Sequence, residues 1–199
     1  MEFQLVYEGP LNGSGNRKSQ VGNKHAIRKC FHRQLAILWS TNPLLSRQAN
    51  RINLHAQKYI HRLAHQFNRC GFLFAPLVTK ELGLVCNLNI LLLRRKNPGQ
   101  ILNRDGDIDN QLKTLFDACR LPVQCTEVAE QPTSDETPFF CLLEDDTLIT
   151  KVNVTTERLL TPVEDGQSEN HTLLIIGVTV KQAIEETLPR PLNKWEDHF

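Results

Sequence analysis

The sequence predicts an α+β fold in which a mixed β-sheet packs against helices, within a single domain spanning residues 1–199. Helical patterns dominate residues 24–69, strand-like apolar segments begin at residue 72, and the two kinds do not alternate as in a βαβ protein. Hydrophobic residues make up 40% of the chain and charged residues 23%. These values are ordinary for a globular protein and exclude a collagen, a coiled coil and a wholly disordered chain.

The N-terminal part is expected to form one strand and two helices. Phe3–Tyr7 is a short apolar stretch before the breaker Gly9-Pro10, which predicts a strand. Residues 11–24 are rich in Gly, Asn, Ser and basic side chains, which is typical of a mobile surface loop. Residues 24–40 and about 44–68 carry apolar side chains at helical spacing, so both segments are expected to be helices.

Strands are expected where apolar residues run together, over 72–78, 84–93, 139–143, 148–156 and 171–180. The segment 84–93 has few polar positions, which is typical of a central strand buried on both faces. A helix is expected over 109–119, with Asp109 as its N-cap. Residues 121–138 are polar and punctuated by proline, which predicts a long loop insertion.

The N-terminus lacks the features of a signal peptide, and no apolar run reaches the roughly 18 residues of a membrane span. The six cysteines are scattered without a CxxC pair or a regular framework, so we expect reduced thiols. A cytoplasmic protein without a membrane partner is therefore expected. His61 and His65 have metal-compatible spacing but lack the Glu of HExxH, which favours surface or core histidines over zinc ligands.

The formal net charge of +1 conceals an uneven distribution. Residues 1–104 contain 16 Lys and Arg against 3 Asp and Glu, whereas residues 105–199 contain 7 against 19. Such asymmetry indicates contact with nucleic acid or membrane, or an acidic tail. The basic side chains expected in the loop, Arg17, Lys18 and Lys24, are candidates for contacting DNA phosphates. For any single basic residue, a solvated helix face is the alternative.

Two acidic clusters are the strongest candidates for chemistry. Asp105, Asp107 and Asp109 alternate, so an extended chain would place them on one face, where a hard cation such as Mg²⁺ would relieve their repulsion. A calcium-binding EF-hand loop is excluded, because Asn110 stands at its glycine position and Phe116 at its glutamate position. The second cluster is Glu144-Asp145-Asp146. The alternatives are a helix cap with a solvated turn for the first cluster and a hairpin tip for the second.

Together these segments resemble the RusA-type Holliday-junction resolvases. The matching residues are Asp107-Ile108-Asp109-Asn110, Lys113, Phe116-Asp117-Ala118 and Leu142-Leu143-Glu144-Asp145-Asp146. The resemblance covers roughly residues 84–156 and implies a RusA-like fold with two extra N-terminal helices over residues 24–69. The chain departs from the family in its length, in the insertion over 121–138, and in having Gly106 before the first Asp of the motif, with Arg104 the nearest basic residue.

The resemblance implies a metal-dependent endodeoxyribonuclease that resolves four-way junctions in DNA recombination and repair. By position, Asp107, Asp109 and Asp146 look like the metal-binding carboxylates, and Lys113 looks like the essential lysine. The implied metal is Mg²⁺, with Mn²⁺ as the alternative, and the implied assembly is a homodimer that makes two opposed nicks. Arg104 joins the candidate DNA-binding residues. Two other functions remain open: a non-catalytic nucleic-acid-binding or interaction protein with the same fold, and a nuclease for flap or fork DNA.

Overall fold

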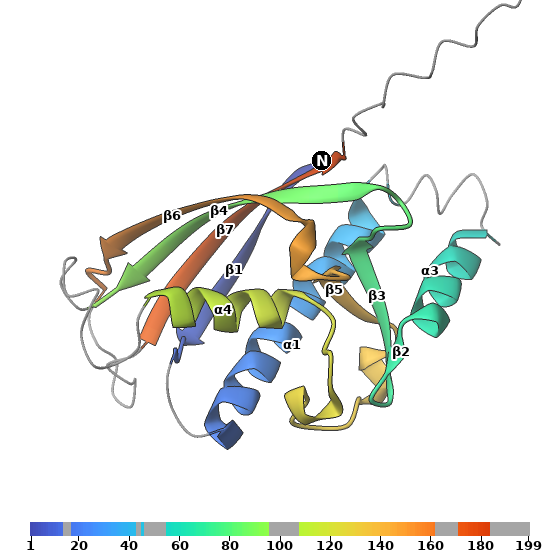
Figure 1. Ribbon diagram of the computed structural model, residues 1–199, viewed down its shortest axis with the longest axis horizontal. Coiled ribbons are helices and arrows are strands. Elements are labelled where there is room, and N and C mark those ends of the chain that lie inside the picture. The colour runs from blue at the N-terminus through green and yellow to red at the C-terminus, as the bar shows by residue number, and fades with distance from the viewer. Residues whose placement is uncertain (14–16, 43–44, 46–54, 96–107, 162–170, 184–199) are drawn as a thin grey trace, which may run out of the picture.

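The computed structural model describes residues 1–13, 17–42, 45, 55–95, 108–161 and 171–183 (Figure 1). Over these ranges the chain forms three α-helices and two mixed β-sheets, which confirms the predicted α+β class. The helices are α1 (Arg17–Thr41), α3 (His55–Gln66) and α4 (Ile108–Cys119). None of the helices in these ranges is long and apolar enough to cross a lipid bilayer.

The larger sheet has four strands in the order β1-β7-β4-β6. Their bounds are β1 Glu2–Pro10, β4 Leu84–Arg94, β6 Ile149–Arg158 and β7 His171–Gln182. β7 is antiparallel to both β1 and β4, whereas β4 and β6 are parallel. The carboxyl ends of β4 and β6 therefore meet at one edge of the sheet, on the side where α4 begins (Figure 1).

One face of this sheet forms the core. Alternate residues of β4 and β7 are buried, because a strand turns successive side chains to opposite faces and α1 and α4 lie on one of them (Figure 1). The prediction that residues 84–93 are buried on both faces is wrong, since Asn89 on the opposite face is exposed. The predicted strand itself is confirmed, as is the helix over 109–119, which begins one residue earlier.

The predicted loop over residues 11–24 is wrong from Arg17 onward, because α1 begins there. At least one of the polar residues that suggested a loop, Asn23, makes hydrogen bonds within the protein. Asn23 is buried in α1, donates from Nδ2 to the Pro10 carbonyl at 2.6 Å and accepts the Asn12 N–H at 3.1 Å. These bonds hold residues 10–12 against α1, so the polar residues near the start of α1 make contacts within the protein.

β1 runs through Pro10 instead of stopping at Gly9-Pro10, which an edge strand tolerates because a proline there need not donate to a neighbour. Its outer edge is closed in the middle by a side chain of α1. The Val6 N–H donates to Gln34 Oε1 at 2.9 Å, and Gln34 Nε2 donates to the Val6 carbonyl at 2.6 Å. Of the second predicted helix, over 44–68, the structure describes α3; residues 46–54 lie outside the described ranges.

The smaller sheet has the order β2-β3-β5, with β2 at Asn68–Arg69, β3 at Phe72–Val78 and β5 at Phe139–Leu143. Residues 121–138 are largely irregular, as expected of a loop, with two short 3₁₀ turns at Cys125–Glu127 and Ser134–Glu136 and a cis Thr137-Pro138 bond. The expectation of reduced cysteines is wrong for Cys70 and Cys125, which form a disulfide. The fold joins residues separated by 55 positions, a pairing that local spacing does not reveal.

Candidate functional site

The start of α4 carries two exposed charged residues, Asp109 of the segment Asp107-Ile108-Asp109-Asn110 (the acidic motif) and Lys113. Asp109 lies in the first turn, where its Oδ1 accepts the N–H of Asn110 at 2.7 Å. Lys113 lies one turn further on the same exposed side. The opposite side of the helix is apolar and buried through Leu115, Ala118 and Cys119, which fixes the direction in which the charged side chains point.

The first turns of α4 are held by the connection that follows β1. A Cβ on Gly13 would lie 3.0 Å from Gln111 Cγ and 3.1 Å from the Gln111 backbone N, so the two segments touch through backbone. Thr114 Oγ1 donates to the Asn12 carbonyl at 3.2 Å. These contacts fix the position of the helix start that carries the acidic motif.

The end of β4 meets the same helix. The Arg94 guanidinium donates through NH2 to Gln111 Oε1, and Gln111 is buried two residues after Asp109. Burial lowers the pKa of the Arg94 guanidinium from its usual value. The start of α4, the end of β4 and residues 12–13 after β1 therefore meet at one corner of the molecule.

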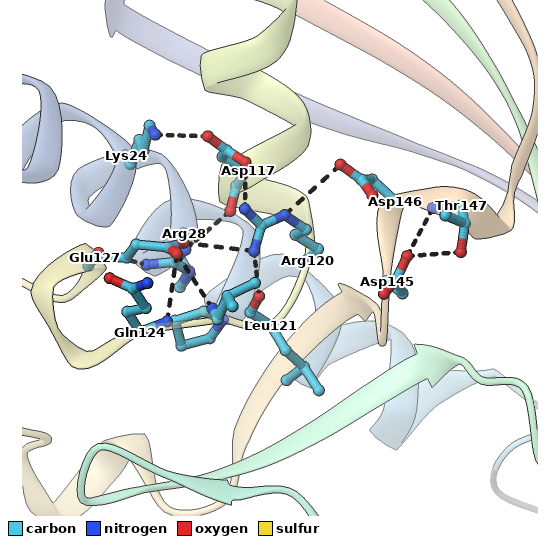
Figure 2. Close-up of polar contacts among 12 residues, drawn as sticks. Lys24, Arg28, Asp117, Arg120, Leu121, Gln124, Glu127, Asp145, Asp146 and Thr147 are labelled. Atoms are coloured by element: carbon cyan, nitrogen blue, oxygen red, sulfur yellow. Dashed lines mark hydrogen bonds and ion pairs between the residues drawn. The ribbon is translucent and has the colours of Figure 1, made fainter.

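Lys113 has no ion-pair partner within the part of the chain that the structure describes. Asp109 and Asp117 are the carboxylates at helical spacing from Lys113, but Asp117 forms ion pairs with Lys24 and Arg120 instead. Asp117 Oδ2 lies 2.5 Å from Lys24 Nζ, and its Oδ1 lies 2.5 Å from Arg120 NH2 (Figure 2). The Lys113 ammonium is exposed and can meet an anion from outside the chain.

The Asp117 carboxyl belongs to a buried charge network between α1 and α4 (Figure 2). Its side chain is 10% exposed. Burial on its own would raise the pKa of this carboxyl, but the hydrogen bond from Lys24 and the charges of Arg120 and Lys24 outweigh it, so the pKa lies below its usual value. The fully buried Arg28 donates to the backbone carbonyls of Asp117 at 2.9 Å and Glu127 at 3.3 Å. The network joins α1 and the irregular segment 121–138 to the end of α4.

Asp146 lies at the first position of a 3₁₀ turn, Asp146–Leu148, between β5 and β6. The hairpin-tip alternative is wrong, because β5 and β6 belong to different sheets. Asp146 Oδ2 lies 3.7 Å from Arg120 Nε, and the Asp146 side chain is 47% exposed (Figure 2). Asp145 caps the turn by accepting the Thr147 N–H at 2.9 Å and the Thr147 hydroxyl at 2.6 Å, and these hydrogen bonds lower the pKa of its carboxyl.

The carboxylates of the two clusters suit a hard cation such as Mg²⁺ in their chemistry. Asp105 and Asp107 lie outside the described ranges, just before α4. Asp109 and Asp146 lie toward opposite ends of α4, since Asp146 contacts Arg120 and the eleven-residue step from Asp109 to Arg120 spans roughly 16 Å of helix. Within the described residues, no group of three His, Cys, Asp or Glu side chains is arranged to hold a metal ion. Asp109 has its carboxylate in solvent, whereas Asp146 has Arg120 beside it.

The predicted DNA-binding residues fall into different positions. Arg17, Lys18 and Lys24 lie within the first eight residues of α1 and not in a loop. Lys18 is exposed, whereas the Lys24 side chain is 19% exposed and engaged with Asp117. Arg104 lies outside the described ranges. On α3, the rings of His61 and His65 are 4.3 Å apart and exposed.

Several residues that contact either end of α4 were not identified from the sequence as site residues. The roles of Arg94, Gly13, Gln111 and Arg120 depend on contacts between segments that are distant in the sequence. The basic residue at the end of an apolar strand was the one available signal.

The sequence matches no protein-family model and no curated protein. The architecture defines an α+β protein with a four-stranded and a three-stranded mixed sheet. α4 begins beside the ends of β4 and β6 and carries Asp109 and Lys113 there.

Proposed function

We propose that this chain is a divalent-metal-dependent endodeoxyribonuclease that acts on branched DNA such as four-way junctions. The observation that carries the proposal is the segment Asp107-Ile108-Asp109-Asn110 entering α4, followed one turn later by Lys113. Lys113 is exposed and has no ion-pair partner among the residues described. An acidic motif with an unpaired cation one turn away suits the handling of a phosphodiester, and the resemblance to the RusA-type resolvases supports the same function.

In this proposal, different residues of the chain would bind the metal, orient a ligand and stabilise charge on the phosphate. Asp107 and Asp109 would hold Mg²⁺ or Mn²⁺, which supplies a polarised phosphoryl oxygen and a bound water of lowered pKa. The Asn110 N–H orients the Asp109 carboxylate. Hydrolysis joins the water oxygen to phosphorus and breaks the bond to the 3′ oxygen, which leaves with a proton. Lys113 would offset the negative charge that develops on the phosphate.

Asp146, the predicted third carboxylate, lies beside Arg120 at the far end of α4, so it would have to move toward Asp109 as well as leave Arg120 in order to join this metal. The loss of the Arg120 contact would itself cost little free energy, because the ion pair is long at 3.7 Å and Asp146 is partly exposed. A homodimer would present two such sites for two opposed nicks. The size of the protein in solution, measured by light scattering, tests this assembly.

The decisive experiment is nicking of synthetic four-way junctions, forks and linear duplexes with Mg²⁺. Asp107→Asn and Asp109→Asn are expected to abolish cutting while leaving the fold intact. Glu2→Gln is the matched control, because Glu2 is an exposed carboxylate at the start of β1 and far along that strand from the corner. Equal cutting by the wild type and the two Asp variants would refute the site, and equal cutting of duplex and junction would refute the preference for branched DNA.

The ion pair between Arg120 and Asp146 favours a second candidate function, a non-catalytic nucleic-acid-binding protein, because it leaves one expected ligand already neutralised. This function predicts junction binding that is unchanged by EDTA and no cutting with Mg²⁺ or Mn²⁺. The nicking assay combined with a binding assay in EDTA separates the two functions.

A further inference from the structure

Two arginines end neighbouring parallel strands at the corner where α4 begins. Arg94 is the last residue of β4, Arg158 is the last residue of β6, and the two are direct partners in the β4–β6 register. Adjacent strands are about 4.8 Å apart, so both side chains leave the sheet close together and toward the same face. This is the face on which α4 lies, as the bond from Arg94 to Gln111 requires.

Neither guanidinium is neutralised by the residues that the structure describes. No carboxylate forms an ion pair with Arg94 or Arg158 in those ranges, and the neighbouring Glu157 points to the opposite face of the sheet. Arg94 Nε is buried and has no hydrogen-bond acceptor there. Like charges opposite each other on adjacent strands are destabilising unless an anion joins them.

A phosphodiester is the anion that best fits two neighbouring guanidinium groups. A guanidinium is a planar group of N–H donors that matches phosphate oxygens. Gln111 accepts from Arg94 NH2 and Arg94 Nε is buried, so Arg94 would meet the phosphate through its remaining N–H groups, held in a fixed orientation. Arg158 is exposed at the end of β6, and Lys113 is exposed on α4. A strand of DNA that reaches the acidic motif would pass these cations.

We propose that Arg94 and Arg158 together bind a backbone phosphate of the DNA next to the one that is cut, and so position the strand at the start of α4. This inference rests on the proposed function, since it names how the same corner binds its substrate. It requires no base contact, so the contribution of the two arginines to binding is independent of DNA sequence.

The test measures binding of a labelled four-way junction in EDTA at several salt concentrations, with no cutting involved. Arg158→Gln is expected to weaken binding by about tenfold and to reduce the slope of log K against log[salt] by about one. Arg33→Gln removes the same charge from an exposed position on α1 and is the control. Arg94→Lys, which keeps the charge but loses the fork, is expected to weaken binding while thermal unfolding stays close to that of the wild type.

The outcomes separate this inference from the proposed nuclease activity. Junction binding that depends on Arg158 in a protein that cuts nothing would support the phosphate site and refute the nuclease. Normal cutting and binding by Arg158→Gln, equal to Arg33→Gln, would overturn the phosphate site and leave the nuclease intact. A wild-type protein that binds no DNA would overturn both.

Discussion

The Arg120 guanidinium lies 3.7 Å from the carboxylate of Asp146, and this contact joins the end of α4 to the chain segment that links the two sheets. The same guanidinium lies 2.5 Å from Asp117 and donates to the Leu121 carbonyl at 2.8 Å. Its side chain is 13% exposed. Arg120 therefore connects the buried network of α1 and α4 with the candidate third metal ligand.

Arg120→Ala is expected to destabilise the protein by about 3 kcal/mol, because it leaves the buried Asp117 with one cation fewer. The free energy of unfolding in urea, measured by circular dichroism, tests this. Arg62→Ala is the control, since the Arg62–Glu81 ion pair is exposed on both sides, and its loss should cost less than about 1 kcal/mol. Similar losses for the two variants would contradict the structural role of Arg120.

Gly13→Ala is expected to destabilise the protein by about 1–3 kcal/mol, because the new Cβ would lie 3.1 Å from the Gln111 backbone and push against the start of α4. Gly22→Ala makes a matched comparison. A Cβ at Gly22 meets nothing within 4 Å, and Gly22 lies inside α1, so alanine there should stabilise by about 0.5–1 kcal/mol. Opposite signs in thermal unfolding would support the close approach at Gly13, and equal signs would contradict it.

Lys113→Met is expected to lower the rate of junction cutting by about 100-fold, because it removes the cation assigned to the phosphate. Its effect on the free energy of unfolding should stay within about 0.5 kcal/mol, since Lys113 is exposed and has no ion pair in the described part of the chain. Single-turnover cleavage and urea unfolding are measured on the same preparation. A large loss of stability would show that Lys113 has a structural role instead.

Asp117 is expected to make the protein sensitive to acid. The pKa of its carboxyl is lower in the folded state than its usual value, so the unfolded chain binds its proton more readily. The stabilisation is complete above about pH 5 and is lost as the pH falls through 4 and then through the lower folded pKa. The difference in unfolding free energy between the wild type and Asp117→Asn should shrink from pH 7 to pH 3. A constant difference would contradict this role.

The Cys70–Cys125 disulfide is expected to stabilise the protein by about 2–4 kcal/mol, because it closes a long loop in the unfolded chain. Peptide mapping without reductant should recover a cross-linked pair of peptides containing the two residues. Addition of a dithiol reductant should lower the midpoint of thermal unfolding of the wild type but not of Cys125→Ser. Identical midpoints for the wild type with and without reductant would contradict the bond.

Much of the fold could be predicted because the signals were local. The segments 72–78 and 84–93 are apolar and follow glycines, and residues 109–119 have a clear apolar stripe, so their elements were placed within about two residues. The start of α1 was missed because its polar residues, Asn23 above all, bond to the connection after β1 rather than to solvent. The composition of a segment does not show whether its polar side chains will bond to a distant part of the chain.

The candidate site could be predicted only in part. The Asp109 and Lys113 spacing is local to one helix and was visible in the sequence. The pairing of Arg94 with Arg158 depends on the register of two parallel strands separated by more than fifty residues, and the contact of Asp146 with Arg120 depends on the passage between sheets. Both relationships arise from tertiary structure, which no short window of sequence contains.

The side-chain amide of Gln34 affects which edge of the large sheet could pair with a strand from another molecule. By occupying the donor and the acceptor of Val6, it prevents another strand from continuing the large sheet beyond the middle of β1. β6 forms the other border of that sheet. Two copies that joined their sheets into one continuous layer would therefore pair through β6. Arg158 of each copy would then lie at the interface between them.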